Sequence, residues 1–238
     1  GQTRAVQVAG LGGVPSDAIG VVLNVTATDT TSSSYLTVWP QPNPQPSTSN
    51  LNWDRAGQTV ANLVYTGLGP TGAVSIYNNL GRASVVVDVF GYYEPPSVSG
   101  GLAFVPVTPN RILDTRYAIG GPATPLGAGE GRTVSVAGTN AIRPDAAAVL
   151  VNLTATRPTA VSYLTLWPSG VAQPGTSNLN MLPGETRANA ALDMLGGGNL
   201  SLYNNRGKSD AIIDVLGQYI PPDGTSGEFV PLQPSRLL

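Results

Sequence analysis

Polar and apolar residues alternate with a period of two along most of the chain, which is the pattern of half-buried β-strands. No window of about eleven residues carries an amphipathic helical pattern, although Ser16–Ile19 and Pro144–Ala148 could each form one helical turn. In the first half of the chain, the predicted strands are Arg4–Ala9, Ile19–Thr28, Ser34–Trp39, Thr48–Trp53, Thr59–Tyr65, Ala73–Tyr77 and Ser84–Val89.

Glycine and asparagine mark the ends of these strands. Leu68–Gly72 and Asn78–Gly81 lie between apolar runs, and both residue types tolerate the positive φ of tight turns, so these segments predict hairpin loops. Roughly seven or eight short strands per unit, at this turn spacing, predict an all-β fold made of antiparallel β-sandwiches, either jelly-roll or Ig-like.

The chain carries the same pattern twice. LNVTAT at Leu23–Thr28 returns as VNLTAT at Val151–Thr156, an offset of 128 residues. Near the other end Phe104 returns as Phe229, an offset of 125 residues. A slowly drifting offset indicates one unit repeated with short deletions in its loops, so we predict two tandem sandwich repeats.

Two short segments rich in proline and glycine, Glu94–Gly101 and Pro221–Gly227, are predicted linkers. A Phe-Val-Pro sequence and a leading strand follow each linker, but the first unit lacks such a strand at its own start. Gly1 aligns with Gly129, inside the second unit, so we expect a processed or partial chain. The predicted domains are residues 1–96 (repeat one without its leading strand), 97–222 (linker and repeat two) and 223–238 (linker and spare leading strand).

The spare strand suggests how the first unit is completed. Unpaired backbone groups on a sheet edge recruit strands, so we predict that Phe229, Val230, Leu232 and Leu237 fill the vacant edge of residues 1–93. Filling within one chain would give a closed pair, and filling between chains would give head-to-tail polymers. The alternative is that the chain ends have no structural meaning.

The amino-acid composition indicates which partners and which location this β-protein is expected to have. Charged residues make up 11% of the chain, against about 25% in typical domains, and the net charge is −2. This balance gives no basic surface for nucleic acid, and no apolar run approaches the roughly 18 residues of a membrane span, so neither partner is expected. The many Ser, Thr, Asn and Gly residues are typical of extracellular β-proteins, so we predict an extracellular or cell-surface location.

Missing residue types exclude most catalytic chemistry. His and Cys are absent, which removes catalytic triads, thiol nucleophiles and His or Cys metal ligands. Asp88 and Asp214 occupy equivalent positions inside apolar strands, so we interpret them as structural. Arg111 and Arg116, with Asp114, are the predicted ion-pair partners that attach a leading strand to a closing strand. We therefore predict no enzyme, no cofactor and no metal.

Aromatic residues at strand ends are the candidates for ligand contact. An aromatic ring beside asparagine amides offers a sugar a stacking face and fixed hydrogen bonds. A Trp or Tyr at a strand end also commonly caps the core, and this interpretation is favoured. The candidate glycan contacts are Trp39, Tyr77, Asn78, Trp167, Tyr203 and Asn204.

The motifs RILDTR at Arg111–Arg116, LNVTAT, YLTVWP, SNLN and DVFGYY together resemble a tandem repeat of secreted and cell-surface proteins of actinobacteria. The resemblance covers nearly the whole chain, twice, and implies export and an accessory role; it brings no known binding residues. We predict an extracellular structural or assembly module whose partners are other copies of the repeat. The alternative is a carbohydrate-binding module that holds a secreted protein on a cell wall or another polysaccharide.

Overall fold

The computed structural model describes residues 1–46, 49–94, 101–221 and 229–237, and these form sixteen β-strands and no helix. The all-β prediction is therefore confirmed. The first seven strands are β1 (Gln2–Gln7), β2 (Gly20–Thr28), β3 (Ser34–Pro40), β4 (Leu51–Trp53), β5 (Val60–Gly67), β6 (Ala73–Asn78) and β7 (Ser84–Tyr93). The next eight are β8 (Ala103–Asp114), β9 (Glu130–Ser135), β10 (Ala148–Thr156), β11 (Ser162–Pro168), β12 (Leu179–Met181), β13 (Arg187–Met194), β14 (Asn199–Asn204) and β15 (Asp210–Ile220). The last is β16 (Phe229–Arg236).

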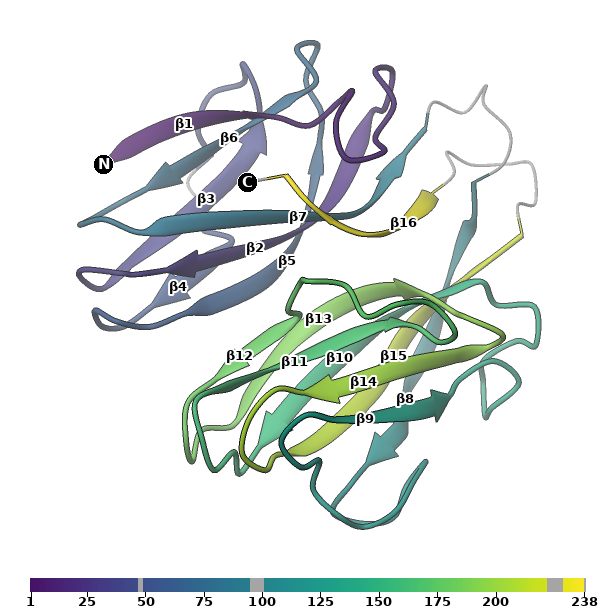
Figure 1. Ribbon diagram of the computed structural model, residues 1–238. Helices are drawn as coiled ribbons and strands as arrows, with labels where there is room; N and C mark the ends of the chain where they lie inside the picture. Colours follow the sequence, from purple (N-terminus) through teal and green to yellow (C-terminus); the bar gives the residue numbers. More distant parts are fainter. Residues whose placement is uncertain (47–48, 95–100, 222–228, 238) are drawn as a thin grey trace.

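The strands form four antiparallel sheets, which pair into two sandwiches (Figure 1). In the first sandwich the sheets are β1-β6-β3-β4 and β16-β7-β2-β5, and in the second they are β12-β11-β14-β9 and β13-β10-β15-β8. When β8 to β15 are numbered one to eight, the second pair of sheets reads 5-4-7-2 and 6-3-8-1. That is the strand order of a jelly roll, whereas an Ig fold pairs its first strand with its second.

The turns differ from the prediction. Leu68–Gly72 and Asn78–Gly81 contain glycines at positive φ, Gly72 at 67° and Gly81 at 59°, but they carry the chain from one sheet to the other instead of closing hairpins. Ser16–Ile19 and Pro144–Ala148 each contain a short turn and no helical turn, and Ala148 already begins β10. Among strands adjacent in the sequence, only the β3–β4 and β11–β12 pairs lie side by side in the described sheets.

The last strand of the chain completes the first sandwich. β16 pairs antiparallel with β7 and places Arg236 opposite Asp88, and β8 pairs antiparallel with β15 and places Arg111 opposite Asp214. β16 therefore holds the sheet edge in the first sandwich that β8 holds in the second (Figure 1). The second sandwich is thus inserted in the chain between two neighbouring strands of the first, β7 and β16.

The two sandwiches share a contact made by their facing sheets. Each sandwich has its own apolar core, and a third cluster joins the sheet of β2, β5 and β7 to that of β10, β13 and β15. Its buried members are Val22, Leu63, Phe90, Ala148, Leu192 and Tyr219. β2 is buried on both faces because it lies between this contact and its own core, which explains the continuous apolar run Val21–Leu23 at its start.

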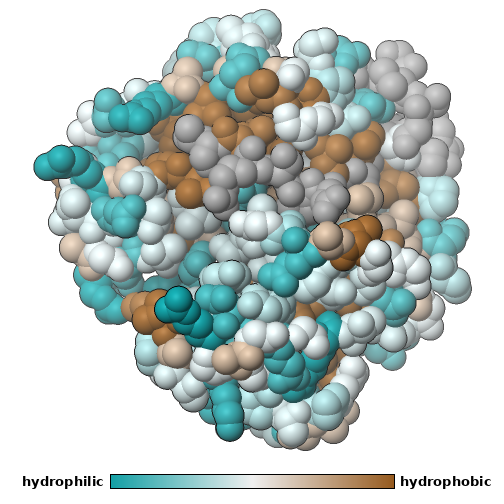
Figure 2. Space-filling model, viewed as in Figure 1, coloured by the Kyte–Doolittle hydropathy of each residue, from teal (hydrophilic) through white to brown (hydrophobic). Residues whose placement is uncertain are grey.

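The surface of the two sandwiches differs in the view of Figure 2. Hydrophobic residues gather on the first sandwich around the path of β16, whereas the second sandwich presents mainly polar residues on this face. The described side chains of β16 explain part of this apolar character: Val230 and Leu232 pack against the core of the first sandwich, as does Leu237 just beyond the strand.

Candidate functional site

The junction between a leading strand and the body of its sandwich is best defined in the second sandwich. The Arg111 guanidinium donates from Nε to Asp214 Oδ1 at 2.8 Å and from Nη2 to Asp214 Oδ2 at 3.2 Å. A two-pronged bond of this kind fixes orientation as well as charge. The bond joins β8 to β15, as the structural interpretation of Asp214 requires.

Asp114 completes this junction from a fully buried position. Its carboxylate accepts hydrogen bonds from Arg116 Nη2 at 2.7 Å, from Arg116 Nε at 2.9 Å and from Arg111 Nη1 at 3.0 Å. The hydrogen bonds from Arg116 are the main cause that lowers the pKa of Asp114 to about 2, against the penalty of burial. Thr115 continues the attachment by donating from Oγ1 to Asp210 Oδ1 at 2.9 Å.

We expect Asp114→Asn to destabilise the second sandwich by about 2–4 kcal/mol, because it leaves the Arg116 guanidinium without its buried anionic partner. The folded pKa of Asp114 is depressed, so its contribution is present above the unfolded pKa of about 3.9 and is lost as the pH falls towards 2. Thermal unfolding from pH 7 to pH 2 measures this: the loss caused by Asp114→Asn shrinks over that acid range.

Asp145→Asn is the matched control for this change. Asp145 also forms an ion pair with an arginine two residues away, Arg143, at 2.6 Å, but both side chains are about half exposed. An exposed pair of this kind contributes little, so the control leaves the unfolding midpoint nearly unchanged. Equal effects of the two substitutions would contradict a special role for the buried pair.

The equivalent junction in the first sandwich is built on β16. Asp88 is buried, takes part in a polar or electrostatic interaction and lies opposite Arg236 in the strand register. Leu237 donates its backbone N–H to Val87 O at 2.7 Å, just beyond the end of β16. The side chain of Phe229 lies outside the described part of the molecule.

Two glycines explain why the LGGVP sequence lies against β16. A Cβ on Gly12 would lie 2.6 Å from Leu237 Cδ2, and a Cβ on Gly13 would lie 3.4 Å from Leu232. Gly12 also has a φ of 59°, which a side chain with a Cβ adopts only with strain. A side chain at Gly12 would therefore need both a strained backbone and a shift of the Leu237 side chain, whereas at Gly13 the constraint is the φ of 88°, since a Cβ there would only touch Leu232.

The candidate aromatic residues do not form open stacking faces at Trp39 and Trp167. Trp39 is 6% exposed and donates from Nε1 to Asn43 O at 2.8 Å, and Trp167 is 8% exposed and donates to Val171 O at 3.2 Å. Each indole is covered by the loop that follows its own strand. A sugar ring needs an exposed aromatic face, so these two positions do not fit the predicted glycan contact.

The tyrosine and asparagine candidates make contacts within their own sandwich. Tyr77 packs against Tyr35 with ring centroids 6.2 Å apart, and Tyr203 packs against Tyr163 at 6.3 Å. Asn78 accepts a bond from Ser34 Oγ and donates to Gly81 O. Asn204 is fully buried. Both asparagines therefore fix the turn after their strand instead of pointing at a ligand.

A polar link between the two sandwiches was not predicted from the sequence. Asn189 donates from Nδ2 to Asn24 Oδ1 at 3.2 Å and accepts the backbone N–H of Leu63 at 3.1 Å. Asn24 in turn donates to Ser177 O at 2.8 Å. Both asparagines are buried, so this link fixes how the facing sheets sit on each other.

Asp193 on β13 is a second residue that was not predicted from the sequence. Both carboxylate oxygens are buried and lack a hydrogen-bond partner among the described residues. Burial raises the pKa of Asp193 well above its usual range. The signal was present in the sequence, because Asp193 stands in an apolar strand where the first repeat has Thr66.

Comparisons with known proteins add no relative: no protein-family model matches the sequence, and no curated protein matches it. The described residues contain no helix long and apolar enough to cross a membrane. Within those same residues, no three acidic side chains gather into a group that could hold a metal ion. The geometry of the strand junctions is therefore the main basis for a function.

Proposed function

We propose that this chain is an extracellular structural and assembly module in which a leading strand joins one sandwich to the next. The observation that supports this is the pairing of β16 with β7, in the edge position that β8 holds beside β15. β16 follows the second sandwich in the sequence but lies in a sheet of the first, β16-β7-β2-β5. Neighbouring units are therefore joined by strand pairing as well as by a linker. The resemblance to the actinobacterial surface repeat supports the extracellular setting.

This connection suits a rigid spacer. The second sandwich is tied to the first at both of its ends, through β7 and through β16. The apolar cluster around Val22 and Tyr219 and the Asn24–Asn189 link then hold the facing sheets together. Separating the sandwiches would expose this buried contact, and pulling the C-terminal end would have to detach β16 first.

We expect the chain to be a monomer over a wide range of concentration, because β16 already fills the first sandwich from within the same chain. Light scattering coupled to size-exclusion chromatography, from micromolar to near-millimolar protein, measures this. A mass that grows with concentration would show that β16 is exchanged between chains and would contradict the closed pair.

Binding to insoluble chitin, cellulose and peptidoglycan tests the function itself. A spacer stays in the supernatant after sedimentation with each polymer. Retention that is lost in Tyr77→Ala and Tyr203→Ala would overturn the structural role and support the carbohydrate-binding alternative, because these are the predicted aromatic contacts that keep some exposure.

A further inference from the structure

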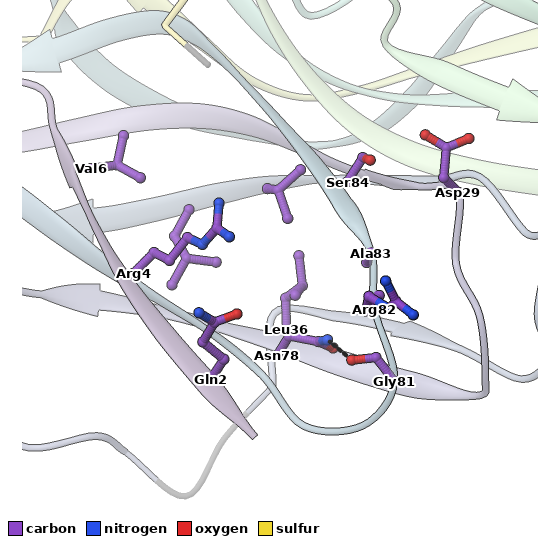
Figure 3. Close-up of a pocket in the computed structure, with 12 residues that line it drawn as sticks. Gln2, Arg4, Val6, Asp29, Leu36, Asn78, Gly81, Arg82, Ala83 and Ser84 are labelled. Atoms are coloured by element: carbon purple, nitrogen blue, oxygen red, sulfur yellow. Dashed lines mark hydrogen bonds between the residues drawn. The ribbon is translucent and has the colours of Figure 1, made fainter.

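The first sandwich contains a cavity of about 480 Å³ at one end of its apolar core. It lies between β1 and the turn that joins β6 to β7, with Arg4 reaching into it from β1 and Asn78 and Gly81 on the opposite side (Figure 3). Val6, Leu36 and Ile76, all buried core residues, line its base. An apolar base with polar groups at the rim is the usual form of a binding site.

The equivalent place in the second sandwich is filled by the chain itself. Leu126 is fully buried there and belongs to the apolar core. Its backbone N–H donates to Ser209 O at 2.8 Å, and its carbonyl accepts from Ser209 N at 3.0 Å. Ser209 corresponds in the repeat to Ala83, which lines the cavity of the first sandwich.

Two side chains hold this filling segment, and both have counterparts at the cavity. Arg132 donates from Nη1 to Thr124 O at 2.8 Å and from Nη2 to Pro125 O at 2.9 Å. Asn204 donates from Nδ2 to Leu126 O at 3.2 Å. Their counterparts in the first repeat are Arg4 and Asn78, and both line the cavity.

Arg4 is the clearest sign of a missing partner. The Arg4 side chain is exposed and makes no hydrogen bond or ion pair within the described residues, whereas the equivalent Arg132 makes four hydrogen bonds. In the described residues, Arg4 therefore holds no segment equivalent to the one that Arg132 holds in the second sandwich.

We propose that the cavity of the first sandwich is a receptor for a polypeptide segment of the same chemistry as residues 114–129. Such a segment would place a leucine, preceded by proline and followed by glycine, on the apolar base. Its backbone would pair with that of Ala83, as the backbone of Leu126 pairs with that of Ser209 in the second sandwich. Arg4 would donate hydrogen bonds to its carbonyl groups. This inference deepens the proposed function, because it extends the joining of units beyond β16 to the segment that follows a leading strand.

A synthetic peptide with the sequence of residues 114–129, added to the full chain, tests the proposal. Calorimetric titration is expected to show saturable binding with one peptide per chain, and the unfolding midpoint is expected to rise with peptide concentration. Arg4→Ala is expected to weaken binding about tenfold, because it removes charge-assisted hydrogen bonds to the peptide carbonyls. Arg143→Ala, at an exposed arginine of the second sandwich, is the matched control and leaves binding unchanged.

A peptide with aspartate in place of the residue equivalent to Leu126 is expected not to bind, since the apolar base cannot accept a charge. Binding of this peptide, or equal binding to Arg4→Ala, would overturn the proposal. A second protein, with residues 114–129 appended after Leu238, removes the cost of association and is expected to melt at a higher temperature than the original chain.

The outcomes for the two proposals are distinguishable. If neither the free peptide nor the appended segment has an effect while β16 still stabilises the first sandwich, the receptor is wrong and the assembly function stands. If β16 itself proves unnecessary for the first sandwich, the assembly function fails irrespective of the peptide result.

Discussion

Replacing Leu232 and Leu237 together by aspartate lowers the unfolding midpoint of the chain by roughly 10 °C. Both side chains pack against the core of the first sandwich in a half-buried position, so each charge costs about 2 kcal/mol through lost apolar contact and desolvation. Differential scanning calorimetry measures the shift. We expect the transition to broaden or split, because the second sandwich keeps its own leading strand, β8.

Val171→Asp is the control for this change. Val171 is 48% exposed in a loop of the second sandwich, so the same kind of substitution there leaves the midpoint within about 2 °C. Gly12→Val approaches the same junction from the other side, because its new side chain would collide with Leu237. If neither β16 nor Gly12 substitutions lower the midpoint, the first sandwich does not depend on the donated strand.

The alternation of polar and apolar residues predicted the strands well, because it follows directly from the burial of one face of a strand. The prediction Ala73–Tyr77 became Ala73–Asn78, and Ser34–Trp39 became Ser34–Pro40. The same alternation does not indicate which strands are neighbours in a sheet. A glycine turn at positive φ suits a hairpin and a crossing between sheets equally, so Leu68–Gly72 was misassigned.

The junction chemistry was predictable for a different reason. Asp214 lies in an apolar strand, where a carboxylate needs a cation, so the arginines of the RILDTR sequence were its natural partners; in the structure its side chain is partly exposed and pairs with Arg111. The tryptophans were ambiguous from the sequence, because the loop that covers an indole is set by tertiary structure. Trp39 and its cover, Asn43, are close in the sequence, but nothing in the intervening residues specifies the fold-back.

The contact between the sandwiches was hidden by the repeat itself. Asn24 and Asn152 are equivalent in sequence, yet Asn24 is buried against Asn189 while Asn152 stays half-buried. Because the two repeats have nearly the same sequence pattern, the pattern does not reveal which residues of each repeat form the contact between the sandwiches. The asymmetry arises from how the sheets are docked, and that depends on β16 and on side chains of both units at once.

Asp193→Thr raises the unfolding midpoint at pH 7 by roughly 5 °C, because it removes a buried carboxylate that has no hydrogen-bond partner among the described residues and is worth about 2 kcal/mol of destabilisation. Threonine is the residue at the equivalent position in the first repeat, Thr66. Thermal unfolding of both proteins between pH 4 and pH 8 measures the effect.

The pH dependence separates this cause from a change in packing. The folded pKa of Asp193 is raised, so the folded chain holds its proton at a pH where the unfolded chain has lost it. Stability therefore falls as the pH rises above the unfolded pKa of about 3.9, and the advantage of Asp193→Thr grows over the same range. Asp193→Asn keeps the shape without the charge and should reproduce the pH trend. A gain that is constant from pH 4 to pH 8 would mean that the carboxylate has found a partner and that packing alone explains the difference.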